Sequence, residues 1–542
     1  REESPVGDGN ETTDEYALVF EEGYARNQAT RNTLTVNSRF ILQALRAIVS
    51  SDTGLQEPLS LDSPFQLLHQ HWEDIEEHHR LATDDDARAH LGLLMDFMNA
   101  ELGSEHKRIH AMVRKSQINF KDLWHVFTPG EELYYSHGNH PWLLRCAKIS
   151  YQESSVGGPI YLVTARNTDC SGDVAGDAEL QVAIKRSSFG RDDMIRIDEL
   201  PIYPLAFWVG EHVQLRKKLE DRGSTFLSVA QGAHFKYYSG AAEYLQPSPS
   251  GYLLSGPDSV GEWRPFTEIG RVIVDRSAFE VEIGAKINHI KPTDAPDPVT
   301  CPPYVIGYSP RQKTWCRYFV DNLSEIEWKA DPWDSLLLQD RHKRALKVLV
   351  ESQPLPENPY DEEQQKGKGL VVLLHGPHGT GKTLAAETAA ESAKKIIIPL
   401  TAADLVTNLP RHASKWGAVL LLENADAVLP SHPDSNSAAS ASVAPLLHLM
   451  EHLPGTLLLT TTHLSSLSPA LKSHVSLALG FEAPGPESRR HLWLLFLSAV
   501  PEAELDMMPD KDVDRWHLMA EKLNGREIAR TVQTARTLAR AE

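Results

Sequence analysis

The residues with the clearest chemical potential lie in "GPHGTGKT", residues 376–383. Glycines at this spacing let backbone N–H groups curl around a phosphate, while Lys382 can reach its outer oxygens and the Thr383 hydroxyl can bind magnesium. An apolar run precedes the motif and an Ala-rich helical pattern follows it, and a helix beginning here adds its positive N-terminal dipole. The pattern therefore predicts a phosphate-binding loop that takes a nucleotide with Mg²⁺.

A second group of polar residues ends the apolar run of "AVLLLENADAVL", residues 418–429. Nucleotide-hydrolysing enzymes usually carry two acids at the positions of Glu423 and Asn424. Glu423 can still serve a metal ion, but the Asn424 amide cannot accept a proton near neutral pH and so cannot act as general base. General-base catalysis contributes about 10² to 10⁴ in rate. The sequence therefore predicts that binding survives and that hydrolysis is strongly slowed.

The elements that must position these residues alternate between apolar strand-like runs and helical stretches. The strand-like runs are "LVVLLHG", "KIIIPL", "AVLLLENA", "GTLLLTTT" and "VSLALGF". This alternation predicts an α/β fold, a parallel sheet covered by helices, over residues 329–483. Residues 484–542 have helical patterns only.

Three further regions precede this one. Residues 1–32 are rich in acids and are expected to be a flexible tail. Residues 33–150 have mainly helical periodicity, with an apolar stripe that includes Leu91, Leu94 and Met98, which we interpret as core. Residues 151–328 contain short alternating runs separated by Gly, Pro and Asp, which predict a β-rich region.

Composition limits the partners and the compartment. The 542 residues carry a formal net charge of -20, which argues against nucleic acid or an anionic membrane as the main partner. No apolar run approaches the roughly 20 residues of a membrane span. Four widely spaced cysteines indicate neither a disulfide framework nor a zinc cluster, so we expect an intracellular, cytoplasmic or nuclear protein.

Histidines gather among acids in "HQHWEDIEEHH", and two more are spaced four residues apart on a predicted helix. They are His69, His71, His78, His79, His106 and His110. No H-E-x-x-H pattern is present and no third ligand accompanies the second pair, so a solvated helix face is the better interpretation than a metal site.

The motifs together resemble those of AAA+ ATPases. "GPHGTGKT" is similar to their Walker A motif, "AVLLLENADAVL" to Walker B, "LLLTTTH" to the sensor 1 strand and "LKSHVSLAL" to the arginine-finger segment. "LNGREIARTVQTARTLA" resembles the lid helix that carries sensor 2, and the upstream region resembles that of large fungal-type AAA proteins. The resemblance implies a P-loop AAA+ core with a C-terminal helical lid, preceded by the α-helical and β-rich regions.

The resemblance also implies the site. The cofactors would be ATP and Mg²⁺, with Thr383 and Glu423 serving the metal. The nucleotide-binding residues would be Gly376, Pro377, His378, Gly379, Thr380, Gly381, Lys382, Thr383, Leu384 and Arg526. The catalytic positions would be Glu423, Asn424, Thr462 and His474. Family members assemble into rings, so a homo- or hetero-oligomer is expected.

Three of these positions depart from the family in the direction of lower activity. Besides Asn424, Thr462 replaces the usual sensor 1 asparagine and His474 replaces the arginine finger. An arginine finger is worth about 10³ to 10⁵ in rate, and imidazole is mostly uncharged at pH 7. Residues 401–417 are also short for the helix and pore loop of the family and lack an aromatic-hydrophobic-Gly triplet.

These observations leave three interpretations of function. The first is an ATP-binding scaffold or regulatory subunit with weak or lost hydrolysis. The second is an active ATPase that remodels protein complexes, with Asp426 or another carboxylate as the base. The third places the function in residues 33–328, with the ATPase-like region as an assembly platform.

Overall fold

The computed structural model describes most of the chain, and its compact units do not follow the order of the sequence. The described residues are 16–21, 32–49, 58–154, 158–172, 174–190, 193–247, 261–284, 286, 288–352, 369–428, 438–467, 469–501 and 522–541. The first unit comprises residues 1–170, 174–227 and 288–303. The second unit comprises residues 171–173, 228–287 and 304–542.

The first unit begins with a small sheet against which helices pack. Its strands are β1 (Leu18–Glu21), β2 (Thr33–Val36) and β3 (Leu59–Asp62), in that order. Its helices are α1 (Arg39–Ile48), α2 (Gln66–Gln70), α3 (Trp72–Leu81), α4 (Asp85–Phe97), a π-helical turn (Met98–Leu102) and α5 (Gly103–Val113). The predicted stripe of Leu91, Leu94 and Met98 lies in this core.

Part of the predicted acidic tail is a strand. Leu18 to Glu21 pair with β2, and the ring of Phe20 lies 5.3 Å from that of Phe97. Three consecutive apolar residues at 18–20 give this segment a face to bury, which its acidic neighbours obscure in a composition count. Residues 1–15 and 22–31 of the predicted tail lie outside the described residues.

Four histidines meet in the first unit. His69 comes from α2, His106 and His110 from α5, and His125 from a 3₁₀ turn (Leu123–His125). The Nδ1 atoms of His69 and His106 are 3.4 Å apart, and the ring centroids of His110 and His125 are 5.3 Å apart. His69 is only 2% exposed, so the interpretation as a solvated helix face is wrong for this residue.

The cluster is nevertheless not arranged around a metal. In the described part of the chain, no group of three or more His, Cys, Asp or Glu side chains could hold a metal ion. His69 Nε2 and His125 Nδ1 are buried without a hydrogen-bond partner among the described residues. Burial, reinforced by the neighbouring imidazoles, lowers the pKa of both His69 and His125 to about 4.

A larger sheet completes the first unit. Its strand order is β10-β5-β6-β7-β8-β13. A separate two-stranded sheet pairs β4 with β9. The strands are β4 (Gln117–Asn119), β5 (Glu132–His137), β6 (His140–Ser154), β7 (Gly158–Ser171), β8 (Val174–Lys185), β9 (Met194–Arg196), β10 (Ile202–Pro204) and β13 (Lys291–Pro292). Helix α6 (His212–Val229) packs Leu215 and Leu219 with Leu143 of β6.

The second unit begins with an antiparallel barrel. β11 pairs with β12 and β15, and β14 pairs with the same two strands, so four strands close on themselves. β16 pairs with β11 at Tyr237 and Tyr238, on the same edge of β11 that β15 pairs with at Ala242 to Tyr244. The elements are β11 (His234–Pro247), β12 (Gly261–Val274), α7 (Arg276–Ile283), β14 (Tyr304–Ser309), β15 (Thr314–Phe319) and β16 (Leu323–Ser324).

The predicted α/β fold follows and is confirmed. Five parallel strands lie in the order β18-β19-β20-β17-β21. They are β17 (Leu370–His375), β18 (Ile397–Leu400), β19 (Val419–Leu422), β20 (Thr456–Thr461) and β21 (Leu477–Gly480). The helices between them are α10 (Lys382–Ser392), α11 (Leu409–Trp416), α12 (Ala425–Val428), α13 (Ala438–His452) and α14 (Pro469–Ser473), and α8 (Asp340–Glu351) precedes the sheet.

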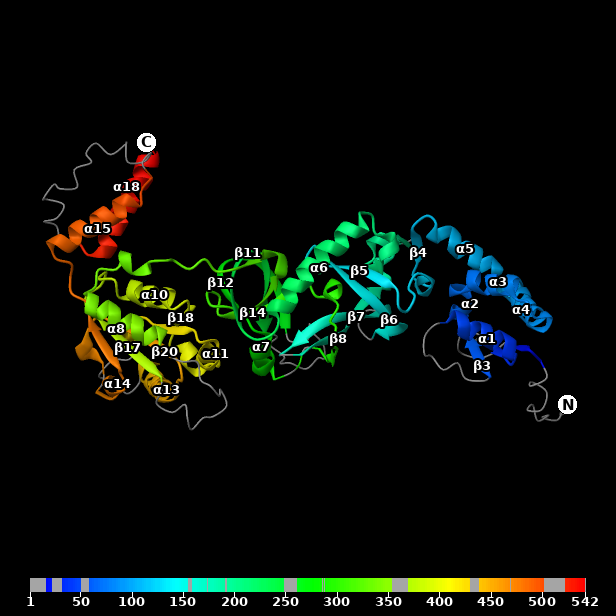
Figure 1. Ribbon diagram of the computed structural model, residues 1–542, viewed down its shortest axis with the longest axis horizontal. Helices are drawn as coiled ribbons and strands as arrows, with labels where there is room; N and C mark the ends of the chain where they lie inside the picture. The colour runs from blue at the N-terminus through cyan, green and yellow to red at the C-terminus, as the bar shows by residue number, and fades with distance from the viewer. Residues whose placement is uncertain are drawn as a thin grey trace. The chain divides into compact units, whose positions relative to one another are not determined.

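Both faces of this sheet are buried, which explains why its strands are apolar throughout. Leu370, Val372 and Leu374 face α8 and α10, whereas Val371 and Leu373 face the core that includes α13. Because side chains alternate between the faces of a strand, only a continuous apolar run can fill both cores. Figure 1 shows β17 and β20 between these helices.

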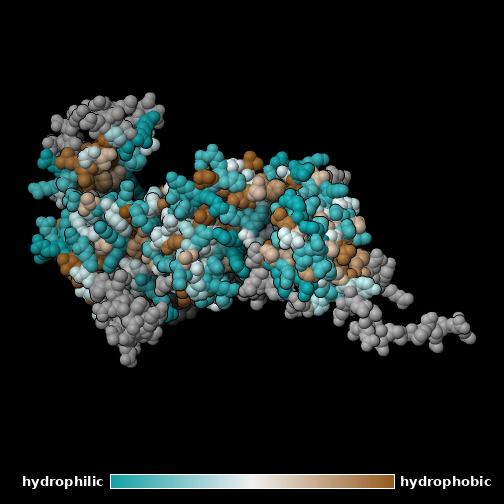
Figure 2. Space-filling model, turned by 45° about the vertical axis from the view of Figure 1, so that its right-hand side comes forward, coloured by the Kyte–Doolittle hydropathy of each residue, from teal (hydrophilic) through white to brown (hydrophobic). Residues whose placement is uncertain are grey.

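Two helices follow the sheet, α15 (Pro486–Ser498) and α18 (Gly525–Ala541), and they share a core around Trp493 and Ile528. The molecular surface in Figure 2 is mainly hydrophilic, with a hydrophobic patch on this part of the chain. Leu494 and Leu538 are exposed on these helices at 46% and 63%. None of the helices in the described ranges combines the length and the apolar character that a membrane crossing requires.

The histidine cluster predicts acid-sensitive stability of the first unit. The folded pKa of His69 lies near 4, below the value of about 6.5 in an unfolded chain, so its contribution is complete above pH 6.5 and is lost as the pH falls toward 4. The full shift corresponds to about 3 kcal/mol. We expect calorimetric unfolding at pH 5.0 to occur at lower temperature than at pH 7.0, and His69→Leu to reduce that difference.

His78 of α3 is exposed and provides the matched control. His78→Leu should keep the full pH dependence of the native chain. An equal temperature shift between pH 7.0 and 5.0 in the native chain and in His69→Leu would show that the cluster does not determine the acid sensitivity.

Candidate functional site

The predicted phosphate loop connects β17 to α10 and has the backbone conformation that the function requires. Gly379 and Gly381 have φ of 72° and 94°, a region in which only glycine is unstrained. A Cβ at Gly376 would lie 2.0 Å from the Phe481 carbonyl oxygen, so no other residue fits there. Helix α10 begins at Lys382 and directs its free N–H groups toward the loop, which makes an anion site.

Lys382 lies inside this loop. Its Nζ donates hydrogen bonds to the carbonyl oxygens of Gly376 and Pro377, both at 2.7 Å, and the residue is 8% exposed. Burial lowers the pKa of Lys382, although Asp426 opposes the shift. A bound phosphate would offer the Lys382 ammonium group a full negative charge in place of the partial charges of two carbonyl oxygens. The ammonium group would therefore gain a stronger hydrogen-bond acceptor when a nucleotide binds.

The two predicted metal ligands are in contact. The Thr383 hydroxyl donates to Glu423 Oε1 at 2.6 Å, which joins the first turn of α10 to the end of β19. Magnesium in proteins is usually held by one or two carboxylates together with phosphate oxygens and waters. The pair therefore fits Mg²⁺ that arrives with a nucleotide, where the ion would neutralise phosphate charge.

Asn424 follows Glu423 with a backbone φ of 50°, in the left-handed region. Its N–H donates to the Thr460 hydroxyl at 3.0 Å, and its side chain is exposed. Asparagine, aspartate and glycine tolerate this conformation, whereas most side chains cost about 1 to 2 kcal/mol there. The amide is therefore compatible with the local backbone, and aspartate is the acid that fits the position best.

Thr462, the predicted sensor 1 residue, is engaged with Asp426. The Thr462 hydroxyl donates to Asp426 Oδ2 at 2.7 Å, and the Thr461 hydroxyl donates to Oδ1 at 3.0 Å. Burial raises the pKa of Asp426, but these hydrogen bonds outweigh burial and hold the pKa below its ordinary value. Asp426, which the sequence offers as an alternative base, is thus a poor proton acceptor, and the sequence did not predict its hydrogen bonds with Thr461 and Thr462.

The lid helix α18 starts at the phosphate loop. The Gly525 N–H donates to the Gly379 carbonyl oxygen at 3.0 Å. Asn524 and Glu527 form a reciprocal cap, with the Glu527 N–H donating to Asn524 Oδ1 at 3.0 Å and the Asn524 N–H donating to Glu527 Oε2 at 2.7 Å. Arg526 is exposed next to this cap, and its positive charge contributes to the lowered pKa of Lys382. The structure therefore brings Arg526 to the loop.

His474 lies elsewhere. It precedes β21, and Ser476 N–H donates to the Val371 carbonyl oxygen at the beginning of β17, whereas the phosphate loop follows the other end of that strand. At about 3.3 Å per residue, Val371 and Gly376 are roughly 16 Å apart. His474 contacts Glu451 at 3.5 Å between Nε2 and Oε1. The structure therefore does not bring His474 to the phosphate loop of its own chain.

Two leucines lie next to the phosphate loop. Leu384, in the first turn of α10, is 40% exposed. A Cβ at Gly381 would lie 3.6 Å from Leu336 Cδ1, so Leu336 covers the loop from the segment before α8. Sequence reasoning missed Leu336, although the apolar run "LLL" at 336–338 is a visible signal.

The segment predicted to be too short for a helix and pore loop does contain a helix. Residues 401–417 form a 3₁₀ turn (Ala403–Val406) and then α11, and Leu405, Leu409 and Trp416 are buried in a core shared with the barrel. Val406 is 73% exposed. Residues 429–437, between α12 and α13, lie outside the described residues.

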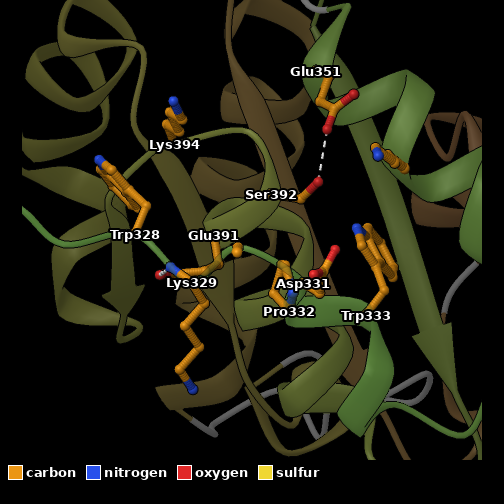
Figure 3. Close-up of a pocket in the computed structure, with 11 residues that line it drawn as sticks. Trp328, Lys329, Asp331, Pro332, Trp333, Glu351, Glu391, Ser392 and Lys394 are labelled. Carbon is orange, nitrogen blue, oxygen red and sulfur yellow. Dashed lines mark hydrogen bonds between the residues drawn. The ribbon is translucent and has the colours of Figure 1, made fainter.

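A separate cavity of about 530 Å³ lies at the far end of α10. It is lined by residues 328–333, by Lys347 and Glu351 of α8, by Glu391 and Ser392 of α10, and by Lys394. Figure 3 shows Trp328 and Trp333 on its walls and the Ser392 hydroxyl donating to Glu351 at 2.7 Å. Because α10 rises about 1.5 Å per residue, this cavity is distinct from the phosphate loop at the start of the helix.

Comparison with known proteins gives two family matches. Residues 372–482 match the family described as "ATPase family associated with various cellular activities (AAA)". Residues 108–209 match a "domain of unknown function (DUF7025)".

Curated relatives are homologs of the 26S proteasome regulatory subunit 6B. The one from Aspergillus niger is 26% identical over 218 residues, which is 36% of this chain and 50% of the relative. The one from Schizosaccharomyces pombe is 26% identical over 188 residues, 31% of this chain and 48% of the relative. The chain thus spans about half the length of these relatives. A solved structure, the FIGL-1 AAA domain in complex with ADP, aligns with a TM-score of 0.30 and 18% identity over 40% of this chain and 76% of its own.

The contact between the lid and the phosphate loop predicts a specific effect of Gly379→Ala. The new Cβ would lie 2.2 Å from Asn524 Oδ1 and would displace the cap of α18. Loss of such a cap costs about 1 kcal/mol, so we expect hydrogen exchange of residues 524–532 to become about fivefold faster. Gly284→Ala is the matched control, because φ there is 67° and nothing lies within 4 Å of the new Cβ. Equal exchange in the two variants would contradict the contact.

Proposed function

Because residues 372–482 are an ATPase domain of the AAA family, we propose that the chain binds ATP with Mg²⁺ in the 376–383 loop and hydrolyses it slowly or not at all. Its role would be that of a nucleotide-stabilised scaffold or regulatory subunit. The observation that carries the proposal is the combination of an intact phosphate loop with an amide at Asn424, where the general base is required.

Retention of binding is supported by the loop and by the residues around it. Lys382 is positioned inside the loop, Thr383 and Glu423 are adjacent, and Arg526 is at its rim. The exposed Leu384 provides apolar surface next to the loop, which suits the uncharged part of a nucleotide.

Loss of hydrolysis is supported by the surroundings of Asn424. Asp426, the nearest carboxylate in sequence after the predicted metal ligand Glu423, accepts hydrogen bonds through both oxygens and its pKa is held low, so it does not replace the missing base well. The Thr462 hydroxyl already donates its only proton to Asp426, so it can contact an attacking water only as an acceptor. These observations disfavour the interpretation as an ordinary active ATPase.

Oligomeric assembly is part of the proposal. The matched relatives are named as regulatory subunits of the 26S proteasome, a multi-subunit complex, which supports a role for this chain inside an assembly. His474 lies away from its own phosphate loop, as a residue directed at a neighbouring subunit would. The exposed leucines of the lid, Leu494 and Leu538, offer apolar surface for such a contact.

We expect calorimetric titration with Mg·ATP to show binding to the unmodified chain and at least 100-fold weaker binding to Lys382→Ala, because the ammonium group contacts the phosphates directly. Lys395→Ala is the matched control, since Lys395 is half-buried and, like Lys382, donates from Nζ to a carbonyl oxygen, in this case that of Val350 at 3.0 Å. Absence of binding to the unmodified chain would refute the proposal and direct attention to residues 33–328.

We expect phosphate release by the unmodified chain to be slower than about 1 s⁻¹, the lower end of ordinary turnover. Asn424→Asp supplies a carboxylate without backbone strain and should raise the rate at least tenfold, whereas Asn424→Glu adds strain at φ of 50°. The double variant Lys382→Ala/Asn424→Asp should lose the gain, and His474→Arg should add to it only at concentrations where subunits assemble.

An ordinary rate in the unmodified chain would instead favour the active ATPase. In that case Asp426→Asn identifies the base: if it abolishes turnover while Mg·ATP binding persists, Asp426 accepts the proton despite its hydrogen bonds.

A further inference from the structure

Resting on the proposed function, we infer that the antiparallel barrel (β11, β12, β14, β15 and β16) regulates the nucleotide site by anchoring the far ends of α10 and β19, and that Arg271 and Trp416 are the positioning residues. The barrel is packed on the ATPase domain at two places. At each place the barrel holds one end of an element, either α10 or β19. The opposite end of that element carries a residue predicted to bind Mg·ATP.

The first anchor holds α10. Arg271 of β12 donates two hydrogen bonds to Glu391, at 2.6 and 2.9 Å, and its guanidinium carbon lies 4.3 Å from the ring centroid of Trp328. The Lys329 N–H donates to Glu391 Oε1 at 2.8 Å. Figure 3 shows Glu391, Lys329 and Trp328 close together at this end of the helix. The fork geometry of arginine fixes orientation as well as distance.

Glu391 stays charged in this contact. Burial raises the pKa of Glu391, but the hydrogen bonds from Arg271 and from the Lys329 backbone outweigh burial and lower it. From Glu391, α10 runs back to Lys382 and Thr383 at its start, about 12 to 14 Å away at 1.5 Å per residue. A shift of one end of so short a helix moves the other end with it.

The second anchor holds β19 through α11. Trp416 is 6% exposed, and its indole N–H donates to Asp275 Oδ2 at 2.7 Å, while Asp275 also caps α7 of the barrel unit. The ring of Trp416 lies 5.5 Å from that of Tyr308 in β14. Lys313 donates to Asp404 at 2.5 Å beside them. Gly417 then connects α11 directly to β19, which ends at Glu423.

The two anchored elements meet at the hydrogen bond between Thr383 and Glu423. The Thr383 hydroxyl donates its proton to Glu423 Oε1 at 2.6 Å, and this hydrogen bond would be lost or rearranged if both oxygens held Mg²⁺. Mg·ATP would therefore change the contact that joins the start of α10 to the end of β19. Because the barrel holds the far ends of both elements, it resists or accommodates that change.

Binding and barrel packing are then coupled in both directions. Mg·ATP changes the packing of the barrel on α10 and α11. In return, a ligand that binds the barrel and shifts it changes the affinity for Mg·ATP by the same factor by which Mg·ATP changes the affinity for that ligand. The coupling belongs to the metal-dependent part of binding, because Thr383 and Glu423 are the residues that would hold Mg²⁺.

The test uses the full chain. Affinity for ATP is measured with Mg²⁺ and with EDTA, and hydrogen exchange of residues 304–319 and 409–416 is measured with and without Mg·ATP. We expect Mg·ATP to slow exchange of both segments at least threefold. Arg271→Ala and Trp416→Phe should each reduce the Mg²⁺-dependent gain in affinity at least fivefold and leave affinity in EDTA within twofold.

Matched controls separate positioning from folding. Arg264→Ala removes an arginine from the same strand whose ion pair is with Glu262 of β12, and Trp493→Phe removes an indole N–H that has no hydrogen-bond partner among the described residues. Both should behave as the unmodified chain. Arg271→Lys, which keeps the cation and loses the fork, should give an intermediate effect even if Arg271→Ala does not fold.

The outcomes distinguish the two proposals. If ATP does not bind the unmodified chain, the proposed function fails and the coupling fails with it. If Mg·ATP binds, but exchange of residues 304–319 is unchanged or the anchor variants match their controls, the coupling alone is overturned.

Discussion

The position of β20 between β17 and β19 is the constraint on which the candidate site depends. All three strands are parallel, so their carboxyl ends lie at one edge of the sheet. The phosphate loop follows β17, the threonine run ends β20 and Glu423 follows β19. The Gly376 N–H donates to the Thr461 carbonyl oxygen at 3.2 Å, which ties the loop to the central strand. Without this strand order, neither the loop nor the metal-ligand pair would be assembled.

Three threonines at the end of β20, Thr460 to Thr462, hold the region after β19 in one conformation through hydrogen bonds. These hydrogen bonds do not require a catalytic acid at position 424. Thr460 accepts from the Asn424 N–H, and Thr461 and Thr462 donate to the two oxygens of Asp426. Each hydroxyl is therefore used to hold the Glu423–Asp426 segment. Because buried polar groups are stable only when paired, this network favours one conformation of the segment. An amide at position 424 is compatible with that conformation, which is consistent with the proposal that binding persists without the base.

The sequence predicts the parallel sheet and the phosphate loop because both are local signals. Apolar runs of four to six residues that fill two cores are visible as such, and the loop has its glycines and Lys382 in one motif. The network around Asp426 could not be predicted in the same way. Its partners are separated by 35 and 36 residues, and only the register of β19 on β20 brings them together.

The same reason explains what was missed in the rest of the chain. His69 reaches His106 across 37 residues, and closure of the barrel requires β11 to pair with β15 as well as with β12. In the histidine cluster, a residue that the sequence places on a solvent-facing helix is buried because a distant element covers it, and in the barrel, strands far apart in sequence pair with one another. The barrel strands also lie on either side of residues 288–303, which belong to the other unit, so the order of segments along the chain does not indicate which of them share a core.

A nucleotide site that turns over slowly has a physical use only if the free energy of binding changes another part of the protein. In this chain one hydrophobic core contains Tyr308 and Trp315 of the barrel together with Trp416 and Leu422 of the ATPase domain. Packed cores change between discrete arrangements and do not deform continuously. The amino end of β19 is attached, through Gly417 and Trp416, to that shared core, so a displacement of β19 would be transmitted to the core. In the proposed coupling, the barrel is therefore the part of the molecule that responds when the site is filled.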